Sequence, residues 1–595
     1  MINVTPGITS LVGPNGSGKT RALRAIQGAL KFSGILFGKK VRFLAAGRSS
    51  PFEHFRADVG GPGHRDTSDA AVGHISLRGQ WWDVESLTGD ILALDLRPDL
   101  KLKVEARLQQ LFDRSLELRW TQSGLSLRIT GTKVGGSYPA NYEASGILQL
   151  VALLSAIHND QIGALLIDEP EISLHPQHQA FLLNEMERVA GDPAEAGKKV
   201  IIIATHSASL LPLRSVDSIP KIAFFESPTK PPAQIQADEG ALKREKMKAL
   251  VARLNATHRA AMFADRILLV EGPSDETIVG LLADRTGAHL SARNAQILPV
   301  TGKGEFPEIA RLFSLMNKRV GVLADLDALA DDNRLVNYFS SQPGAAQAAA
   351  KAGQASLVDM DRQLRNALTT FMRENAKVTE EAANAYPDWS DDAPADLRLR
   401  RVTLARLLSD PESFGSAAEP AKLLSTRYTA LLAALAEVGC FFLRLGAIEN
   451  YYGAGAAAAA KPARAAIEAA TFSDRGLNSL TEIYADVFAA LSFIAPDQGV
   501  DEDLLLRPKL GAIIGALFLS MSDDTGEAQL NNIARNTVGP DADVFRVQNR
   551  SSSGKLRLSI DIESPLFARV EFPFEIDADQ NLNTVVTRVL PGRRT

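Results

Sequence analysis

The sequence predicts an α/β fold of several domains, each built on a mostly parallel sheet. Apolar runs rich in β-branched residues, such as Val200–Ala204 and Ile267–Val270, indicate strands that are buried on both faces. Each run stops at polar or glycine residues, as strands do where an α/β sheet presents its ligand site. The length of 595 residues is too great for one hydrophobic core. We therefore expect two to four domains, with functional residues where the strands of the α/β domains end.

The bulk composition restricts the class of protein. The formal net charge of −5 excludes a generally basic nucleic-acid coat, so a DNA contact would need local basic patches or bound metal ions. The one cysteine, Cys440, stands among apolar residues and is interpreted as core filler, which suits a reducing compartment. The chain shows neither a signal peptide at its start nor an apolar run long enough for a membrane span. We expect a cytoplasmic protein with no membrane partner.

The first strand, Ile8–Val12, leads into a glycine-rich loop, Gly13–Thr20, and then a helical pattern. The loop has the form G-x-x-x-x-G-K-T, whose backbone N–H groups surround phosphates at a helix N-terminus. Lys19 would reach the β and γ phosphates, and the Thr20 hydroxyl would bind magnesium. The candidate nucleotide-binding residues of the loop are Asn15, Gly16, Gly18, Lys19 and Thr20. The sequence thus predicts ATP and Mg²⁺ as cofactors.

Two later strands supply the rest of this nucleotide site. The run Ala164–Ile167 ends in Asp168 and Glu169; Asp168 would hold the metal through its water shell, and Glu169 would orient or deprotonate the attacking water. The next strand delivers His206, which could sense the γ phosphate. A capping or packed imidazole is the alternative for His206.

The order of these three motifs resembles the ABC-type ATPases, including the SMC, RecF and Rad50-like group. The resemblance implies a signature motif before the Asp-Glu strand, and Ser145 and Gly146 match it in Glu143–Leu150, although Ile147 replaces the second glycine. In that family the motif caps the γ phosphate of an opposing domain, which implies a homodimer or higher homo-oligomer through the ATPase heads. Gln80 is the candidate for the metal-lining glutamine of the family. Arg48 is either near the nucleotide or a solvated arginine.

A second group of acids follows two other predicted strands. Glu271 ends the strand Ile267–Val270, and Asp275 lies one helical turn further on the same side. Asp325 and Asp327 end another apolar strand at alternate positions, so they point the same way. Each close carboxylate pair would repel by roughly 1 to 4 kcal/mol unless a cation neutralised it. Oxygen ligands favour Mg²⁺ or Mn²⁺.

This pattern is similar to the Toprim domain, and its position after an ABC-type ATPase resembles the OLD (overcoming lysogenization defect) family of ATP-dependent nucleases, relatives of the Gabija nuclease subunit. The implied fold is an ABC-type P-loop ATPase domain followed by a Toprim (Rossmann-like) domain with a helical insertion. The resemblance implies metal ligands at Glu271, Asp275, Asp325, Asp327 and Glu449. It also implies a catalytic lysine, Lys509, near the scissile phosphate, for which an ordinary helix-start lysine is the alternative. Lys303, in Gly302–Gly304, is expected at the rim of this site, where it could touch phosphate.

The expected boundaries are an ATPase domain over 1–240, a helical linker over 241–262, a Toprim domain over 263–530 and a β-rich segment over 531–595. The basic face of the linker is either solvated or a phosphate contact. The insertion, about 330–437, shows no residues that demand chemistry. The alanine-rich run 454–460 is expected to be a helix or a flexible loop.

The resemblance implies an ATP-controlled, divalent-metal-dependent DNA endonuclease or nickase and, by family analogy alone, a role in anti-phage defence or DNA processing. The alternative is an ATP-operated clamp or scaffold whose non-catalytic Toprim domain binds DNA or a partner effector. The retained acids Glu271, Asp325 and Asp327 argue against that alternative. A topoisomerase would need a separate domain with a nucleophilic tyrosine. Tyr451 and Tyr452 lie too near the predicted metal site to belong to such a domain, so the sequence favours a nuclease over a topoisomerase.

Overall fold

The computed structural model describes residues 2–46, 71–131, 136–300, 302–386, 389, 393–453, 461–496, 501–567 and 571–591. Its contacts divide the chain into two units, Met1–Thr286 with Leu290–Ile494, and Gly287–His289 with Ala495–Thr595. The predictions for Arg48 and for the run 454–460 lie outside the described residues. No helix among those described is both long and apolar enough to cross a membrane.

The first unit begins with a six-stranded sheet in the order β10-β9-β1-β8-β7-β2. Its strands are parallel except β10, which is antiparallel to β9. The strands are β1 (Ile8–Val12), β2 (Lys40–Leu44), β7 (Ile162–Asp168), β8 (Val200–Thr205), β9 (Ile222–Phe224) and β10 (Ala233–Gln234). The helices are α1 (Lys19–Lys31), α2 (Thr88–Leu96), α3 (Pro98–Phe112), α4 (Ser145–His158) and α5 (Pro176–Val189).

The alternation of side chains along each strand assigns the two faces of this sheet. In β8, Ile202 packs in a core with Leu23 and Leu30 of α1, whereas Ile203 packs in another core with α4 and α5. Both faces are therefore covered, which explains the unbroken apolar runs in the sequence. A small antiparallel sheet lies beside α2 and α3 and consists of β3 (Ala71–Val72), β4 (Ser115–Thr121), β5 (Gly124–Gly131) and β6 (Gly136–Pro139).

A second, wholly parallel sheet follows in the order β12-β11-β13-β14. Its strands are β11 (Arg266–Val270), β12 (Ala295–Pro299), β13 (Arg319–Asp325) and β14 (Cys440–Leu443). The helices α8 (Pro273–Arg285), α9 (Phe306–Leu315) and α19 (Ala485–Ile494) contact it. Cys440 is fully buried in β14, as expected. The strands β11, β13 and β14 therefore end side by side.

The segment between the two sheets is helical and buried on one side. It contains α6 (Glu245–Ala252) and α7 (Ala256–Ala261). Met247 and Leu250 of α6 belong to one continuous apolar core that includes Phe224 of the first sheet and Ile267 of the second. At this junction the Asn317 side chain donates a hydrogen bond of 3.0 Å to Glu226. The two sheets are thus linked by packing within one unit.

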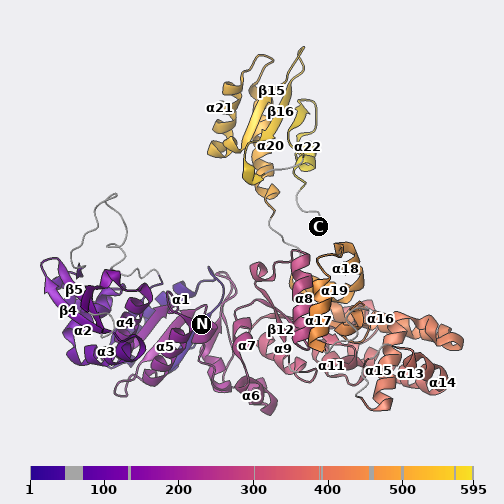
Figure 1. The fold of residues 1–595 in the computed structure, drawn as a ribbon, viewed down its shortest axis with the longest axis horizontal. Coiled ribbons are helices and arrows are strands. Elements are labelled where there is room, and N and C mark those ends of the chain that lie inside the picture. The colour runs from indigo at the N-terminus through magenta and orange to yellow at the C-terminus, as the bar shows by residue number, and fades with distance from the viewer. Residues whose placement is uncertain are drawn as a thin grey trace. The chain divides into compact units, whose positions relative to one another are not determined.

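Between β13 and β14 the chain forms a bundle of helices, which Figure 1 shows grouped together. They are α10 (Asp327–Ala330), α11 (Arg334–Ser340), α12 (Ala345–Lys351), α13 (Leu357–Glu374), α14 (Ala376–Asn384), α15 (Ala395–Ser409) and α16 (Ala418–Glu437). After β14 come η10 (Ile448–Tyr451), α17 (Lys461–Ala470) and α18 (Leu477–Ile483).

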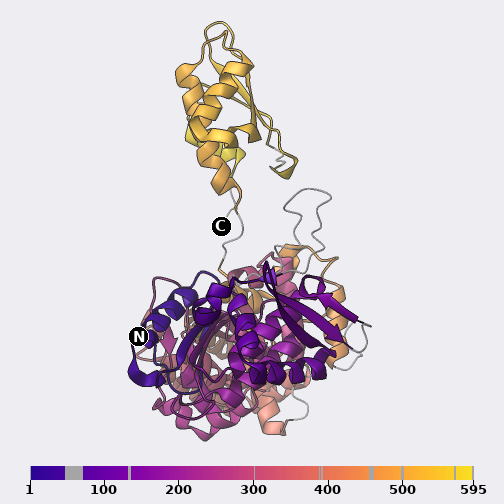
Figure 2. The same cartoon turned by 90° about the vertical axis from the view of Figure 1, so that its left-hand side faces the viewer.

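The second unit has its own core, in which Leu510 and Ile513 pack with Val547 and Ile560. It consists of α20 (Asp503–Ser520), α21 (Glu527–Val538), β15 (Phe545–Asn549), β16 (Arg557–Ile562), β17 (Phe574–Asp577) and α22 (Leu582–Val589), with the strands in an antiparallel sheet (Figures 1 and 2). The contact division falls at Ile494–Ala495, whereas the sequence places the Toprim boundary at residue 530. The long apolar helix α20 belongs with the C-terminal sheet because its apolar face packs there.

Candidate functional site

The glycine-rich loop connects β1 to α1, which begins at Lys19. Lys19 is almost fully buried, and its Nζ donates hydrogen bonds of 2.9 Å to the carbonyl oxygens of Gly13 and Pro14. Burial lowers the pKa of Lys19, opposed by the nearby acids Asp168 and Glu169. A side chain at Gly13 would lie 2.2 Å from the carbonyl oxygen of Phe225, so only glycine fits there. The loop has the compact form that surrounds phosphates.

The end of β7 meets this loop. The Thr20 hydroxyl donates a hydrogen bond of 2.7 Å to Asp168, which is buried at the end of the strand. Glu169 has a left-handed backbone, with φ of 51°, and its Oε1 lies 3.6 Å from Nε2 of His206. Burial lowers the pKa of His206, followed by the charge of Lys19. The four predicted side chains Thr20, Asp168, Glu169 and His206 thus gather at one edge of the first sheet.

Glu171 is a positioning residue at this edge that the sequence did not indicate. It accepts hydrogen bonds from the Thr205 hydroxyl at 2.9 Å and from the backbone N–H of His206 at 2.6 Å. It therefore fixes the turn that presents His206. Its place in Asp-Glu-Pro-Glu, directly after the strand, was the available signal.

Ser145 and Gly146 form the first turn of α4. A side chain at Gly146 would lie 2.3 Å from the carbonyl oxygen of Ser173, so the glycine allows a close approach of two backbones. Glu143 supports the entry to this helix by accepting hydrogen bonds from Arg114 at 2.9 Å and from Tyr138 at 2.6 Å. The remaining candidate, Gln80, is an exposed residue of a short 3₁₀ segment.

The acids of the second sheet gather where β11, β13 and β14 end. Glu271 follows β11, and Asp275 lies in the first turn of α8, where it accepts a hydrogen bond of 2.9 Å from Gly272 N–H. Asp325 ends β13, Asp327 begins α10, and Glu449 lies in η10 after β14. All five candidate ligands therefore come to one edge of the sheet.

Electrostatics show that these five carboxyl groups act on one another. Burial, followed by the charges of Asp275, Glu271, Asp327 and Glu449, raises the pKa of Asp325 well above its usual value. Burial, followed by Asp327 and Asp275, raises the pKa of Glu271 to about 7. Both shifts mean that the ionised cluster is costly without a compensating cation.

Several polar atoms of this cluster lack a hydrogen-bond partner among the described residues. These buried atoms are Oε2 of Glu271, Oδ1 of Asp327 and the hydroxyl of Tyr452. Unpaired carboxylate oxygens beside other carboxylates are the hard donors that Mg²⁺ and Mn²⁺ prefer, so the residues fit a divalent cation. Among the described residues, no group of three acids, histidines or cysteines is already arranged to hold a metal ion. The carboxylates therefore lie near one another without forming a complete coordination shell.

Positive side chains border the cluster. Lys303, in the loop after β12, donates hydrogen bonds of 2.8 Å to Asp327 and 2.5 Å to Asp331. Burial opposes its charge, but these two bonds outweigh it and raise the pKa of Lys303. Arg401 of α15 also binds Asp331 and lies 3.6 Å from Asp327. Arg401 is not among the predicted site residues, because the insertion carries no local motif.

Lys509 does not belong to the unit that contains the carboxylate cluster. It is part of α20 in the second unit, where it forms an ion pair with Asp541. Its assignment near the scissile phosphate remains a prediction.

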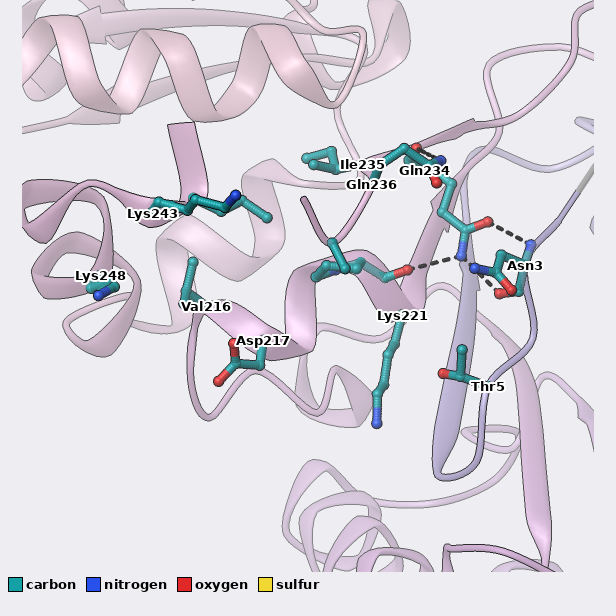
Figure 3. Close-up of a pocket in the computed structure, with 13 residues that line it drawn as sticks. Asn3, Thr5, Val216, Asp217, Lys221, Gln234, Ile235, Gln236, Lys243 and Lys248 are labelled. Carbon is teal, nitrogen blue, oxygen red and sulfur yellow. Dashed lines mark hydrogen bonds between the residues drawn. The ribbon is translucent and has the colours of Figure 1, made fainter. Parts of the chain in front are cut away.

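A cavity of about 340 Å³ lies beside β10 and the helical segment, as Figure 3 shows. Gln234 closes one side of it by accepting a hydrogen bond of 2.8 Å from Asn3 N–H and donating one of 2.8 Å to the carbonyl oxygen of Pro220. Lys221, Lys243 and Lys248 are among its lining residues. It shares no residue with either predicted site.

Comparison with protein families gives two matches. Residues 262–327, which include Glu271, Asp275, Asp325 and Asp327, match the Toprim domain of proteins like the overcoming lysogenization defect protein. Residues 76–211, which include Ser145, Asp168, Glu169 and His206, match a AAA domain described for the AbiEii toxin and type IV TA systems. Gly13–Thr20 precedes the second match.

A curated relative also matches part of the chain. Endonuclease GajA of Bacillus cereus (strain VD045) is 27% identical over 147 residues. The aligned region covers 24% of this chain and 23% of that relative.

Proposed function

Because the chain carries an OLD-like Toprim domain behind an ATPase domain, we propose that it is an ATP-controlled, divalent-metal-dependent DNA endonuclease or nickase. The two matches confirm the resemblance to the OLD family that the motifs predicted. The partial match to an endonuclease supports the reaction class.

The observation that carries this proposal is the gathering of Glu271, Asp275, Asp325, Asp327 and Glu449 at one sheet edge. Carboxylates alone would repel the DNA backbone. The arrangement therefore favours a metal-dependent cutting site over the alternative of a non-catalytic DNA clamp.

In this mechanism Glu271, Asp325 and Asp327, together with Asp275 and Glu449, would hold divalent metal. When bound, such ions supply an activated water and stabilise the departing 3′ oxygen. The protein orients these ligands through its strand ends. Asp275 fixes the turn after Glu271 by accepting the Gly272 N–H bond, and the Leu326 N–H donates a hydrogen bond of 2.8 Å to Gly446, which ties the Asp325 end of β13 to the loop before Glu449.

The residues at the edge of the first sheet would hold ATP and Mg²⁺. Lys19 would contact the phosphates, Thr20 and Asp168 would hold Mg²⁺, Glu169 would orient the attacking water, and His206 would sense the γ phosphate. Ser145 and Gly146 would complete the site of a second copy in a head-to-head dimer. Coupling of the two sites is supported by the continuous core through α6, which includes Val12 before the phosphate loop and Ala324 before Asp325, and by the Asn317–Glu226 hydrogen bond.

The biological setting that we propose, from the family resemblance, is anti-phage defence or DNA processing. A partner effector protein fits that setting.

A plasmid assay tests this function. Supercoiled plasmid is incubated with the full chain in Mg²⁺ or Mn²⁺, with and without ATP, and nicked and linear products are measured. We expect metal-dependent cutting by the wild type and none by Asp325→Ala, whose ATP hydrolysis remains. Cutting by Asp325→Ala at the wild-type rate would reject the assignment. The Glu169→Gln variant should hydrolyse ATP slowly but still bind it, so it tests whether the nucleotide controls cutting. Equal cutting by this variant with and without ATP would reject control by ATP.

A further inference from the structure

The helical insertion reaches the carboxylate cluster through Arg401. Arg401 lies on α15, and its Nη2 is 3.6 Å from Oδ2 of Asp327, one of the proposed metal ligands. Lys303 approaches the same carboxylate oxygen from the loop after β12, at 2.8 Å. Two cations from distant parts of the sequence therefore flank one side of the cluster.

A single acid outside the metal-ligand set holds both cations. Asp331 accepts a hydrogen bond of 2.5 Å from Lys303, and it accepts bonds of 2.9 Å and 2.5 Å from Nε and Nη2 of Arg401. If Asp327 serves the metal, Lys303 and Arg401 lose one of the carboxylates that they contact and share Asp331. Both cations then lie beside the metal site.

The insertion is braced against this loop, so Arg401 is held in place. Arg365 of α13 donates hydrogen bonds to the carbonyl oxygens of Leu329, Ala330 and Asp332, and Arg400 donates one of 2.8 Å to Ala330. These bonds satisfy the carbonyl groups that the short helix α10 leaves open. The side chains of Lys303 and Arg401 still keep 24% and 13% of their surface exposed, which leaves them accessible to a ligand.

We propose that Lys303 and Arg401 bind a backbone phosphate of the DNA beside the carboxylate cluster, which makes the helical insertion part of the substrate-binding surface. The inference rests on the proposed nuclease function. Guanidinium and ammonium groups both bind phosphate through charge-assisted N–H bonds. Such contacts fix the register of a duplex without reading its sequence.

The test measures equilibrium binding of a short fluorescent DNA duplex to the full chain over a range of salt concentrations. Ca²⁺ replaces Mg²⁺ so that binding is separated from cutting. We expect Lys303→Met and Arg401→Gln each to weaken binding several-fold and to lower the slope of log affinity against log salt, by up to about 0.9, the value for the one phosphate contact that the two residues share. Arg401→Lys keeps the charge and should keep the slope.

Arg362→Gln is the matched control. Arg362 lies on α13 of the same insertion and is exposed in an ion pair with Asp359, away from the cluster contacts described above. It should bind DNA with wild-type affinity and slope. An equal loss in this variant would show a general charge effect and overturn the proposal.

Asp331→Asn separates phosphate binding from a purely structural role. The Asp331→Asn variant keeps the positive charges of Lys303 and Arg401. If these two residues bind phosphate, the variant should retain or gain DNA affinity, whereas Arg401→Gln should lose it. Wild-type affinity and slope in both Lys303→Met and Arg401→Gln would reject the phosphate site. Lys303 lies in a loop, so Lys303→Met decides the outcome if Arg401→Gln fails to fold.

The two proposals fail in different ways. A wild type that cuts DNA, with variants that bind like it, rejects only the phosphate site. If the wild type cuts DNA with neither Mg²⁺ nor Mn²⁺, but the variants bind DNA less well than the wild type, the nuclease function is rejected and the phosphate site is retained.

Discussion

Replacing Glu271 with glutamine should stabilise the metal-free protein at alkaline pH. Burial and the charges of Asp327 and Asp275 raise the pKa of Glu271 from 4.5 to about 7. The folded state therefore holds a proton between these two values that the unfolded state has released, so stability falls as the pH rises from 4.5 through 7. At about 1.4 kcal/mol per pKa unit, the full cost above pH 7 is about 3 kcal/mol.

The Glu271→Gln variant removes this ionisation. In EDTA at pH 8 it should unfold with a free energy up to about 3 kcal/mol larger than that of the wild type, and the difference should vanish near pH 4.5. The free energy of unfolding is measured by urea titration of the full chain across this pH range, following the transition of the first unit. Glu482→Gln, at an exposed position of α18, is the control and should have no such pH dependence.

Divalent metal should reverse the order of stability. A cation bound by the cluster stabilises the wild type at pH 8 and stabilises Glu271→Gln less, because one ligand charge is gone. Equal stability of the two proteins in EDTA at every pH would refute the electrostatic reasoning.

Three further changes test other parts of the structure. Lys19→Ala should abolish ATP hydrolysis, measured by phosphate release, because it removes the buried cation of the phosphate loop; unchanged turnover would contradict the nucleotide site. Asp90→Ala leaves Arg42 buried without its 2.5 Å partner, so it should cost about 3 to 5 kcal/mol in urea unfolding, and a loss below 1 kcal/mol would contradict this. Burial lowers the pKa of Lys199 to about 7, so the cost of its charge is fully present below pH 7 and is relieved as the pH rises. Relative to Lys199→Met, the wild type should gain about 2 kcal/mol of stability between pH 7 and 9, and a constant difference would refute the shift.

The sequence predicted the strand ends well because local patterns decide them. β7, β8 and β11 each contain an apolar run that stops sharply at polar residues, and parallel strands of one sheet place such stops at one edge. The gathering of Glu271 with Asp325 follows from that geometry alone.

Other features depend on contacts between distant segments and left no local signal. Arg401 meets Asp331 across the whole insertion, and its position is determined by how α13 and α15 pack against the loop after α10. Lys509 lies in an apolar helix whose packing partners are the C-terminal strands, so a short motif could not show to which unit it belongs. The helices α21 and α22 lie mostly within the segment 531–595, for which the sequence predicted only a β-rich structure.

The claim at the centre is that the carboxylates at the ends of β11, β13 and β14 hold the divalent metal. Binding of Mn²⁺ to nucleotide-free protein, followed by electron paramagnetic resonance, tests it without any need for cutting. The wild type should bind up to about two Mn²⁺ ions per chain, Asp325→Ala should lose them, and Asp168→Ala should keep them. Equal Mn²⁺ binding by the wild type and Asp325→Ala would contradict the claim.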